Sequence, residues 1–552
     1  MTSVTTSVVK KAPFPEVGWA PRASATWLVI VVCSALGLVM AAMTALNLAL
    51  PYIAADIQTT SSQLTWLVDA YTVALAALLL PAGAIGDRRG RRGVMIVGLA
   101  LFAVGSLVAV VLDGPWELIA SRALCGVAAA LIMPATLSLL TSHMPADRRH
   151  MAVAIWAAVA GASGLAGFFL SGLLLEFFDW QSILLVLGGF AALLTFLAMT
   201  IGTSRDEHPG RFDVVGSLLA PAGVALFVVG LLEAPGHGWD SVLVIGCLVG
   251  GVLLGVVFVI AELRSSNPLL DMRLFVNRAF SAGFLCVVLQ FFASLGIFFV
   301  LLQQLQLSIG MSALMAATAM LPIVAVLMVM SPVSAWLAVR VNLRYVLVLG
   351  NALTGLGMVL MGVIDYSTYL GVLPMTMVVA FGQGFATAPP TTAIMSNTPA
   401  ESQGVGSAVN DTGRELGAAI GIAVAGSVVA SGYAHHLAPL LDQLASVPGG
   451  DDIAAPVSRT LAEALVVADK IGPMNPVLAE SIRVQATAAF DSAVASACLV
   501  MGIVVLVGAV VLAIVSPRRI GGSSDPIEPE PDSEPDVASS DGETADLIPR
   551  GR

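Results

Sequence analysis

The sequence predicts an all-α polytopic membrane protein, and three observations support this fold class. The chain of 552 residues is 57% hydrophobic and only 11% charged, whereas soluble domains carry about 25% charged residues. Apolar runs of about 20 residues, long enough to cross roughly 30 Å of hydrocarbon, recur along most of the chain. These runs are apolar on every face, which excludes the alternating pattern of a membrane β-barrel.

Charged, Pro-rich or Gly-rich segments divide the chain into fourteen predicted spans. They are 26–50, 64–86, 94–112, 117–141, 151–175, 182–203, 214–234, 241–262, 279–303, 312–338, 345–364, 369–395, 406–432 and 491–516. Lys and Arg concentrate in short cytoplasmic loops of membrane proteins. If the amino terminus is inside, the short outer loops hold no Lys or Arg. We therefore expect both termini in the cytoplasm and a multi-pass protein of the inner (plasma) membrane.

Two polar ends and one long segment lie outside the spans. Residues 1–25 are predicted to be a cytoplasmic tail without a cleavable signal. Residues 433–490 form the one long outer segment, within which Ser458 to Lys470 has helical amphipathic spacing. Nine of the 36 acids lie between Asp525 and Asp546. Because that region is also rich in Pro and Ser, we expect residues 517–552 to be a disordered acidic tail.

Several kinds of chemistry are excluded by the residues available. None of the three lysines follows a glycine, so the chain has no GxxxxGK[ST] phosphate loop. The stretch from Gly161 to Gly164 is similar to the GxSG of an intramembrane protease. The six histidines all lie in loops or at membrane surfaces, however, so a small-residue helix contact is the better interpretation. The five cysteines lie in apolar runs and HExxH and CxxC are absent, so we predict neither an enzyme nor a metal or cofactor site.

Ionisable residues inside a span cost about 2.5–3.5 kcal/mol and tend to mark a transport pathway. Asp69 lies six residues into the second span, where water access is partial. It is either a buried carboxylate bonded to a neighbouring helix or a cavity-lining acid that attracts a cation or proton. Arg122 of the fourth span would bias a neighbouring carboxylate or serve as its structural partner.

The thirteenth span carries three charged residues on one face. Asp411, Arg414 and Glu415 have i, i+3 and i+4 spacing, and together they carry a net negative charge. If Arg414 pairs with one acid, burial and the like charge favour the protonated form of the other, which could then exchange protons. The alternative is an internal ion pair beside an acid that is neutral at every working pH.

The loop after the second span carries a dense motif. It reads Gly83-Ala84-Ile85-Gly86-Asp87-Arg88-Arg89-Gly90-Arg91-Arg92, which by charge alone is a positive-inside anchor. The stretch resembles the G-x-x-x-D-R-x-G-R-[RK] signature loop of the major facilitator superfamily.

Further stretches resemble the fourteen-span drug:proton antiporter family of that superfamily, which comprises multidrug and antiseptic-resistance exporters. The similar motifs are Thr44-x-x-Asn47-x-Ala49-Leu50-Pro51, Trp66-x-x-Asp69-x-Tyr71, Ser121-Arg122-x-x-x-Gly126 and Asn410-Asp411-Thr412-x-x-Glu415-Leu416-Gly417. The chain differs from the family at two places. Ala42 stands where the first span usually has an acid, and the fifth-span stretch from Gly167 to Gly172 lacks the expected proline.

The resemblance implies a six-helix bundle over 26–204, a two-helix insert over 205–277 and a second six-helix bundle over 278–516. It implies a secondary active exporter of lipophilic, cationic compounds in exchange for protons, working by alternating access around a midplane site. The proton gradient would be its energy source. The implied proton-coupling and cation-recognition residues are Asp69, Arg122, Asp411 and Glu415. The implied cavity residues are Asn47, Trp66, Tyr71, Gln290, Phe291, Phe292 and Arg414. The gating-loop residues Gly83, Asp87, Arg88, Gly90 and Arg91 would stabilise the outward-facing state.

Two alternatives to drug export remain open at this point. A lipid or glycolipid transporter on the same fold predicts a lateral opening and tightly bound lipid. A non-transporting membrane scaffold or sensor predicts that the buried acids are dispensable. We expect a monomer whose partners are lipophilic small molecules or lipids, protons and the surrounding membrane lipid, with no nucleic acid.

Overall fold

The computed structural model describes residues 25–57, 59, 61–112, 114–205, 212–445 and 450–517. All regular secondary structure in these ranges is helical, and fourteen helices are long and apolar enough to cross a membrane. Each of them overlaps one predicted span, which confirms the all-helical fold class and the span count. The predicted tails were 1–25 and 517–552, and all of their residues except Ala25 and Pro517 lie outside the described residues.

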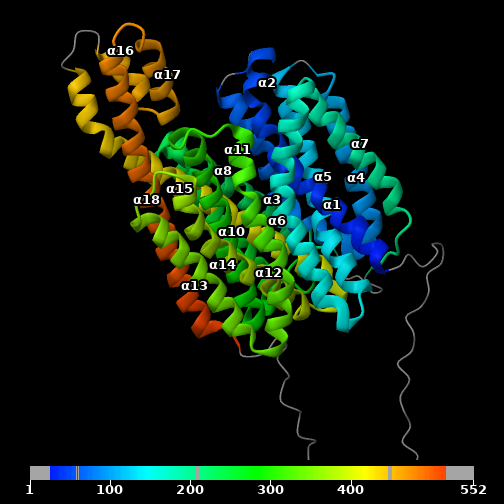
Figure 1. Cartoon of the computed structure of the whole chain (residues 1–552). Helices are drawn as coiled ribbons and strands as arrows, with labels where there is room; N and C mark the ends of the chain where they lie inside the picture. The colour runs from blue at the N-terminus through cyan, green and yellow to red at the C-terminus, as the bar shows by residue number, and fades with distance from the viewer. Residues whose placement is uncertain are drawn as a thin grey trace, which may run out of the picture.

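The first six spans pack into one bundle, coloured blue to blue-green in Figure 1. In this bundle α3 lies along α5, α1 along α6, and α4 against both α5 and α7. The elements are α1 (Ala25–Ala45), η1 (Leu46–Ala49), α2 (Leu50–Ile57), α3 (Ser61–Arg89), α4 (Arg91–Ala109), α5 (Pro115–His143), α6 (Ala146–Phe177) and α7 (Gln181–Ala198). We call this bundle the first half.

Small residues bring α1 and α6 close together. The Thr44 hydroxyl donates a hydrogen bond to the carbonyl of Gly164 at 2.6 Å. A Cβ atom added at Gly167 would meet the Ala41 carbonyl oxygen, so the two backbones are in direct contact. The glycine cluster around Ser163 is therefore a helix contact, as we inferred from the missing catalytic base.

The second half is a bundle of six further spans. Its helix α10 lies along α15, and α13 lies against both α14 and α18. The elements are α10 (Arg278–Gln303), a π-helical turn η3 (Gln304–Ser308), α11 (Ala313–Ala319), α12 (Leu321–Arg340), α13 (Leu343–Val363), α14 (Tyr369–Ser396), η4 (Ala400–Ser402), α15 (Gln403–Ala445) and α18 (Pro476–Val515).

The two-helix insert connects the halves. Its helices α8 (Val214–His237) and α9 (Val242–Arg264) pack against each other, and the short helix η2 (Met272–Val276) leads into α10. Helix α8 touches both halves, through α3 and α15. Helix α9 exposes many large apolar side chains, including Val242 and Leu253, as expected for a helix that faces lipid.

The predicted long outer segment, 433–490, is mostly helical. The ends of α15 and α18 extend into it, and α16 (Gly450–Val457) and α17 (Leu461–Ile471) complete a helical lobe at one end of the molecule (Figure 1). Helix α17 overlaps the amphipathic stretch from Ser458 to Lys470 and ends one residue beyond it. The buried Tyr433 donates a hydrogen bond to the Val457 carbonyl at 3.1 Å, and the apolar core of the lobe is continuous with that of the second half.

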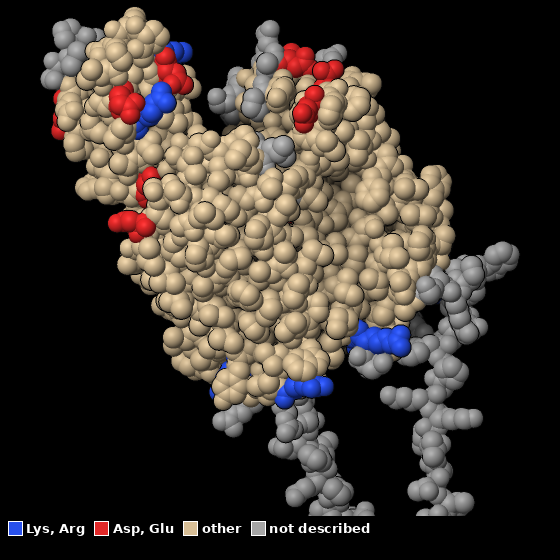
Figure 2. All heavy atoms as spheres, in the orientation of Figure 1, with Lys and Arg blue, Asp and Glu red and all other residues tan. Residues whose placement is uncertain are grey.

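Charged residues divide between the two ends of the molecule. In Figure 2 the bases of the spans gather at the end opposite the lobe, whereas acids dominate the lobe end of the first half. We call the former the basic end; it includes Arg88 to Arg92, where α3 passes to α4. The two halves meet where α15 packs on α3 and α5, and where α6 packs on α11, α12 and α14.

Candidate functional site

The charged face of α15 lies where the two halves meet. Asp411, Arg414 and Glu415, here called the α15 charge group, are 0%, 4% and 5% exposed. Helix α15 belongs to the second half, but it packs against α3 and α5 of the first half, and Ala408 and Leu416, on either side of the group, pack against α3. Any movement of one half against the other therefore changes the surroundings of these three charges.

The α15 charge group is poorly satisfied by hydrogen bonds. The Nη1 atom of Arg414 lies 3.6 Å from Oδ1 of Asp411, and Asn410 donates a hydrogen bond to the same oxygen at 3.2 Å. Asp411 Oδ2 and Glu415 Oε2 are buried and accept no hydrogen bond from any described residue. Because burial of a carboxylate without hydrogen bonds disfavours its charged form, these two oxygens are suited to take up a proton or to face a cation.

Aromatic rings from both halves enclose Arg414. Its guanidinium carbon lies 4.7 Å from the ring centroid of Trp156 on α6 and 4.6 Å from that of Phe291 on α10. The predicted cavity residue Phe291 is thus beside the predicted charges. Trp156 was missed from the sequence because it lies alone in an alanine-rich stretch, and no local spacing connects it with the thirteenth span.

The other predicted cavity residues are not gathered around Arg414. Phe292 is 4% exposed and packs in the core of the second half. Gln290 donates a hydrogen bond to Thr387 of α14 at 2.8 Å, also within that half. Asn47 in η1 and Trp66 in α3 are half-buried and lie toward the lobe end of their spans. Phe291 and Arg414 are in contact, but no described pocket contains the predicted cavity residues together, so their lining of one cavity stays a prediction.

The buried Arg122 binds backbone carbonyls and makes no ion pair with any described carboxylate. Its Nε donates to the Leu67 carbonyl at 3.3 Å, and its Nη2 donates to the Ala42 carbonyl at 3.2 Å. The guanidinium also lies 4.5 Å from the ring centroid of Tyr71, whose hydroxyl donates to the Val39 carbonyl at 2.9 Å. The expectation that Arg122 pairs with a carboxylate was wrong. Residue 42 of the adjoining helix is alanine, so the guanidinium meets a backbone carbonyl at this position and not an acidic side chain. Tyr71 is fully buried beneath the guanidinium.

Asp69 faces the insert. Its carboxylate is close enough to that of Glu233 on α8 for the two negative charges to repel each other. Oε2 of Glu233 lies 2.9 Å from Nδ1 of His237. Asp69 accepts no hydrogen bond from a described residue, so the alternative of a carboxylate bonded to a neighbouring helix is not observed. No described contact joins Asp69 to Asp411 or Glu415. Sequence reasoning missed Glu233 because it lies near the end of its span, where an acid is unremarkable.

The gating loop connects the two halves at the basic end. The Asp87 carboxylate accepts hydrogen bonds from the backbone amides of Gly404 at 2.7 Å and Val405 at 3.0 Å, at the start of α15. It accepts two more from Arg91, from Nε at 2.8 Å and from Nη2 at 2.6 Å. An acid at a helix amino terminus is stabilised by the free amides and the helix dipole. We call these contacts the Asp87 clamp.

Arg91 extends the clamp to further backbone groups. Its Nη2 donates to the Ala400 carbonyl at 3.2 Å, across the interface, and its Nη1 donates to the Ser204 hydroxyl at 3.0 Å, within the first half. A second contact across the halves is nearby, since Thr141 donates to the side-chain oxygen of Gln403 at 3.0 Å. Arg91 is 2% exposed, so this end of the interface is closed.

Two glycines of the loop are required by geometry. A Cβ atom at Gly83 would lie 2.5 Å from the Gly404 carbonyl oxygen, so only glycine lets α3 approach α15 this closely. Gly90 has a φ of 102°, a conformation that residues with a Cβ rarely adopt. The guanidinium of Arg88 lies 5.2 Å from the ring centroid of Phe212, just before α8, and so connects the loop to the insert.

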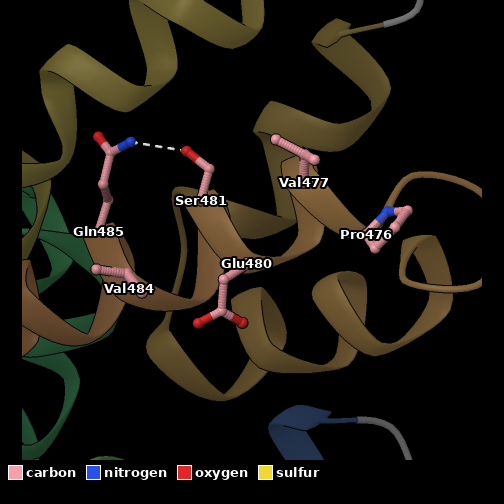
Figure 3. A pocket seen from close by; sticks show the side chains of 6 residues that line it. All are labelled: Pro476, Val477, Glu480, Ser481, Val484 and Gln485. Atoms are coloured by element: carbon pink, nitrogen blue, oxygen red, sulfur yellow. Dashed lines mark hydrogen bonds between the residues drawn. The ribbon is translucent and has the colours of Figure 1, made fainter.

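Two surface hollows lie away from the interface. An apolar groove of about 660 Å³ runs between α1, α6 and α7, lined by residues that include Cys33, Gly37, Ser163 and Phe190. A shallower hollow lies on the lobe (Figure 3), where all six lining residues belong to α18 and Gln485 donates to Ser481 at 2.9 Å. In the described part of the chain, no group of three or more His, Cys, Asp or Glu side chains is placed to hold a metal ion.

Most of the chain is similar in sequence to known proteins. Residues 32–422 match the family model described as the Major Facilitator Superfamily. The chain is 32% identical over 483 residues to the multidrug efflux pump LfrA of Mycolicibacterium smegmatis, covering 86% of this chain and 93% of that protein. It is 33% identical over 417 residues to the cephamycin export protein CmcT of Amycolatopsis lactamdurans, covering 74% and 86%.

Solved structures with this fold are more distant in sequence. The proton:xylose symporter XylE superposes with a TM-score of 0.56 at 12% identity, over 90% of this chain and 96% of that one. The human organic anion transporter MFSD10 superposes with a TM-score of 0.57 at 14% identity, over 89% and 100%. At such identities these two structures show the shared fold and no more.

Proposed function

Because the chain belongs to the major facilitator superfamily, we propose that it is a secondary active drug exporter that moves lipophilic cations out of the cell in exchange for protons. Proteins of this superfamily are transporters, not enzymes, and this chain is a multi-pass protein of the inner (plasma) membrane. Relatives at about one-third identity are named as drug-efflux and antibiotic-export proteins, and their names support a drug as cargo. The cationic class of cargo and the coupling to protons rest on the geometry of this chain.

The observation that carries the proposal is the position of the α15 charge group. Two buried carboxylates with unpartnered oxygens lie at the interface between the halves, beside aromatic rings that suit an organic cation. A proton and a cationic substrate would compete for the same carboxylates, so binding of one favours release of the other. The membrane potential contributes about 2.3 kcal/mol per charge per 100 mV to such an exchange.

The Asp87 clamp supplies the gate in this proposal. If the basic end faces the cytoplasm, as the distribution of bases favours, the clamp closes the inner side while the outer side is free to open. Release of the clamp would then let the halves rock apart on the cytoplasmic side, as alternating access requires. The Asp87 clamp accordingly stabilises the outward-facing state.

Substitution of the two acids tests the coupling. We expect Asp411→Asn and Glu415→Gln each to lower efflux of ethidium from cells at least about tenfold, because a neutral amide can neither carry the exchanged proton nor attract the cation. The measurement is ethidium accumulation at matched protein level. Asp365→Asn, a change at an exposed acid, is the control and should leave efflux unchanged. Full efflux by both variants would remove the α15 charge group from the mechanism and would favour a scaffold or sensor.

The energy source has its own test. In proteoliposomes, ethidium transport should follow an imposed pH gradient, stop on addition of a proton uncoupler, and ignore ATP. Transport that continues without the gradient would refute proton exchange while leaving drug export intact.

A lipid or glycolipid cargo is the second candidate, and one observation favours it. The apolar groove lies on the surface of the spans α1, α6 and α7, which is where an acyl chain would enter. If proteoliposomes transfer fluorescent lipid between leaflets but do not transport ethidium, the cargo is a lipid and not a drug.

A further inference from the structure

The guanidinium of Arg414 lies in a slot formed by one ring from each half. The Trp156 indole of the first half and the Phe291 phenyl of the second half stand 4.7 and 4.6 Å from the guanidinium carbon. Planar, delocalised cations are favoured between aromatic faces, and more strongly so away from water. We call this space the aromatic slot. The slot exists only while the two halves are in contact around Arg414, because each half supplies one of its rings.

The Trp156 wall of the slot is held rigidly. Trp156 is 0% exposed, and its Nε1 donates a hydrogen bond to the Thr136 hydroxyl of α5 at 3.0 Å. Arg414, by contrast, has a long side chain with several rotatable bonds. The ring is therefore a fixed part of the site, and the guanidinium is the part that can leave.

The hydrogen bonds of Arg414 differ from those of Arg91, the buried arginine of the Asp87 clamp in the same interface. The buried Arg91 donates from Nε, Nη1 and Nη2 to side-chain and backbone oxygens at 2.6 to 3.2 Å. The buried Nη1 of Arg414 makes no hydrogen bond with any described residue, and its contact with Asp411 is 3.6 Å long. Its position is thus set by the rings more than by the ion pair.

Each of the two acids beside the slot has one carboxylate oxygen that accepts no hydrogen bond from a described residue. These oxygens are Asp411 Oδ2 and Glu415 Oε2, although a cation stands next to them. A second cation of suitable shape would find the same rings and the same two carboxylates. The slot therefore has the composition of a site for a planar organic cation, and an arginine of the protein occupies it.

We propose that Arg414 is a tethered competitor of the substrate: its guanidinium fills the aromatic slot when the Asp87 clamp is closed, and a planar, delocalised organic cation displaces it. This inference rests on the proposed function and specifies the substrate class. The displaced guanidinium remains close to Glu415, the next residue on α15, so the acids face a positive charge whether or not substrate is present. Cargo leaves more readily because Arg414 returns to the slot.

Equilibrium binding tests this role without any gradient. Full-length protein in lipid nanodiscs is titrated with ethidium, and the dissociation constant is read from fluorescence anisotropy. Because Arg414→Gln removes the competitor and keeps the rings, its Kd should be about tenfold lower than that of the unmodified protein, which corresponds to loss of competing cation–π contacts. An unchanged or higher Kd would overturn the proposal, since a merely structural arginine would weaken the site when removed.

Three further variants keep the result interpretable. Arg340→Gln removes a matched arginine–tryptophan stack on the surface, where the guanidinium lies 4.3 Å from the Trp336 ring centroid; its Kd should not change. Trp156→Leu added to Arg414→Gln should raise the Kd again. If Arg414→Gln does not fold as a monodisperse protein, Arg414→Lys carries the test, with an expected Kd about threefold lower because a compact ammonium fits the slot less well.

The outcomes separate this inference from the proposed function. Ethidium export by the unmodified protein, together with no gain of affinity in Arg414→Gln, would refute the inference alone. Tighter binding by Arg414→Gln without gradient-driven transport would support the inference and refute the coupling. No binding by any variant would refute the aromatic slot as a cation site.

Discussion

Replacement of Asp87 by asparagine should open the basic end of the molecule. The Asp87 carboxylate accepts four hydrogen bonds, two from Arg91 and two from the backbone amides of Gly404 and Val405 across the interface. Asparagine keeps one acceptor oxygen, and its amide nitrogen would face donors. The variant also loses the charge that strengthens the remaining bonds.

The size of the effect follows from those contacts. Hydrogen bonds to a charged group contribute about 1.5–3 kcal/mol each. Loss of one bond across the interface and weakening of the other therefore cost the closed state about 3 kcal/mol. Since each 1.4 kcal/mol is a factor of ten, the ratio of closed to open molecules should fall about a hundredfold, so a population closed about 99% of the time would become evenly divided.

Double electron–electron resonance can measure that ratio. Nitroxides at Arg205→Cys, in the loop that follows the first half, and at Arg340→Cys on the second half report the separation of the halves at the basic end, in a chain without its five native cysteines. Asp87→Asn should add a longer distance of comparable population. The control is Asp271→Asn, which removes an exposed acid that accepts a hydrogen bond from the Arg273 amide without crossing the interface. An unchanged distance distribution in Asp87→Asn would show that the clamp does not hold the halves together.

Three other substitutions probe close packing. Gly83→Ala places a methyl 2.5 Å from a carbonyl oxygen of α15; the same nitroxide pair should report partial opening, and a closed distribution would refute the close approach. Arg122→Lys loses at least one carbonyl bond and the stack on Tyr71, so the purified protein should be about 1–3 kcal/mol less stable to thermal unfolding; an unchanged midpoint would argue against it. Gly167→Leu should prevent assembly of α1 on α6, seen as loss of monodisperse protein, whereas Gly189→Leu, at an open position, should be tolerated.

The sequence was sufficient for features that depend on one segment at a time. Hydropathy and length determine where a helix must cross the bilayer, because unpaired backbone groups are too costly in hydrocarbon. For this reason all fourteen spans were predicted and are found. Helical spacing likewise placed Asp411, Arg414 and Glu415 on one face, since three and four residues make about one turn. The glycine cluster near Ser163 was correctly interpreted as a contact because no base was available in the spans.

Only the tertiary structure decided which charges and rings meet. Asp87 was expected to act in a gate, but its partners in the other half are the backbone amides of Gly404 and Val405. Every residue except proline has such an amide, so the sequence does not indicate which ones will bind. Arg122 was expected to pair with a carboxylate and instead binds carbonyls next to Ala42.

Trp156 and Arg414 are on different halves, so no local spacing could connect them. Inside a membrane most helix surfaces are similarly apolar, and the choice of neighbour depends on shape and on a few small residues at each contact. That information is distributed over two distant segments, and it is expressed only when the helices pack.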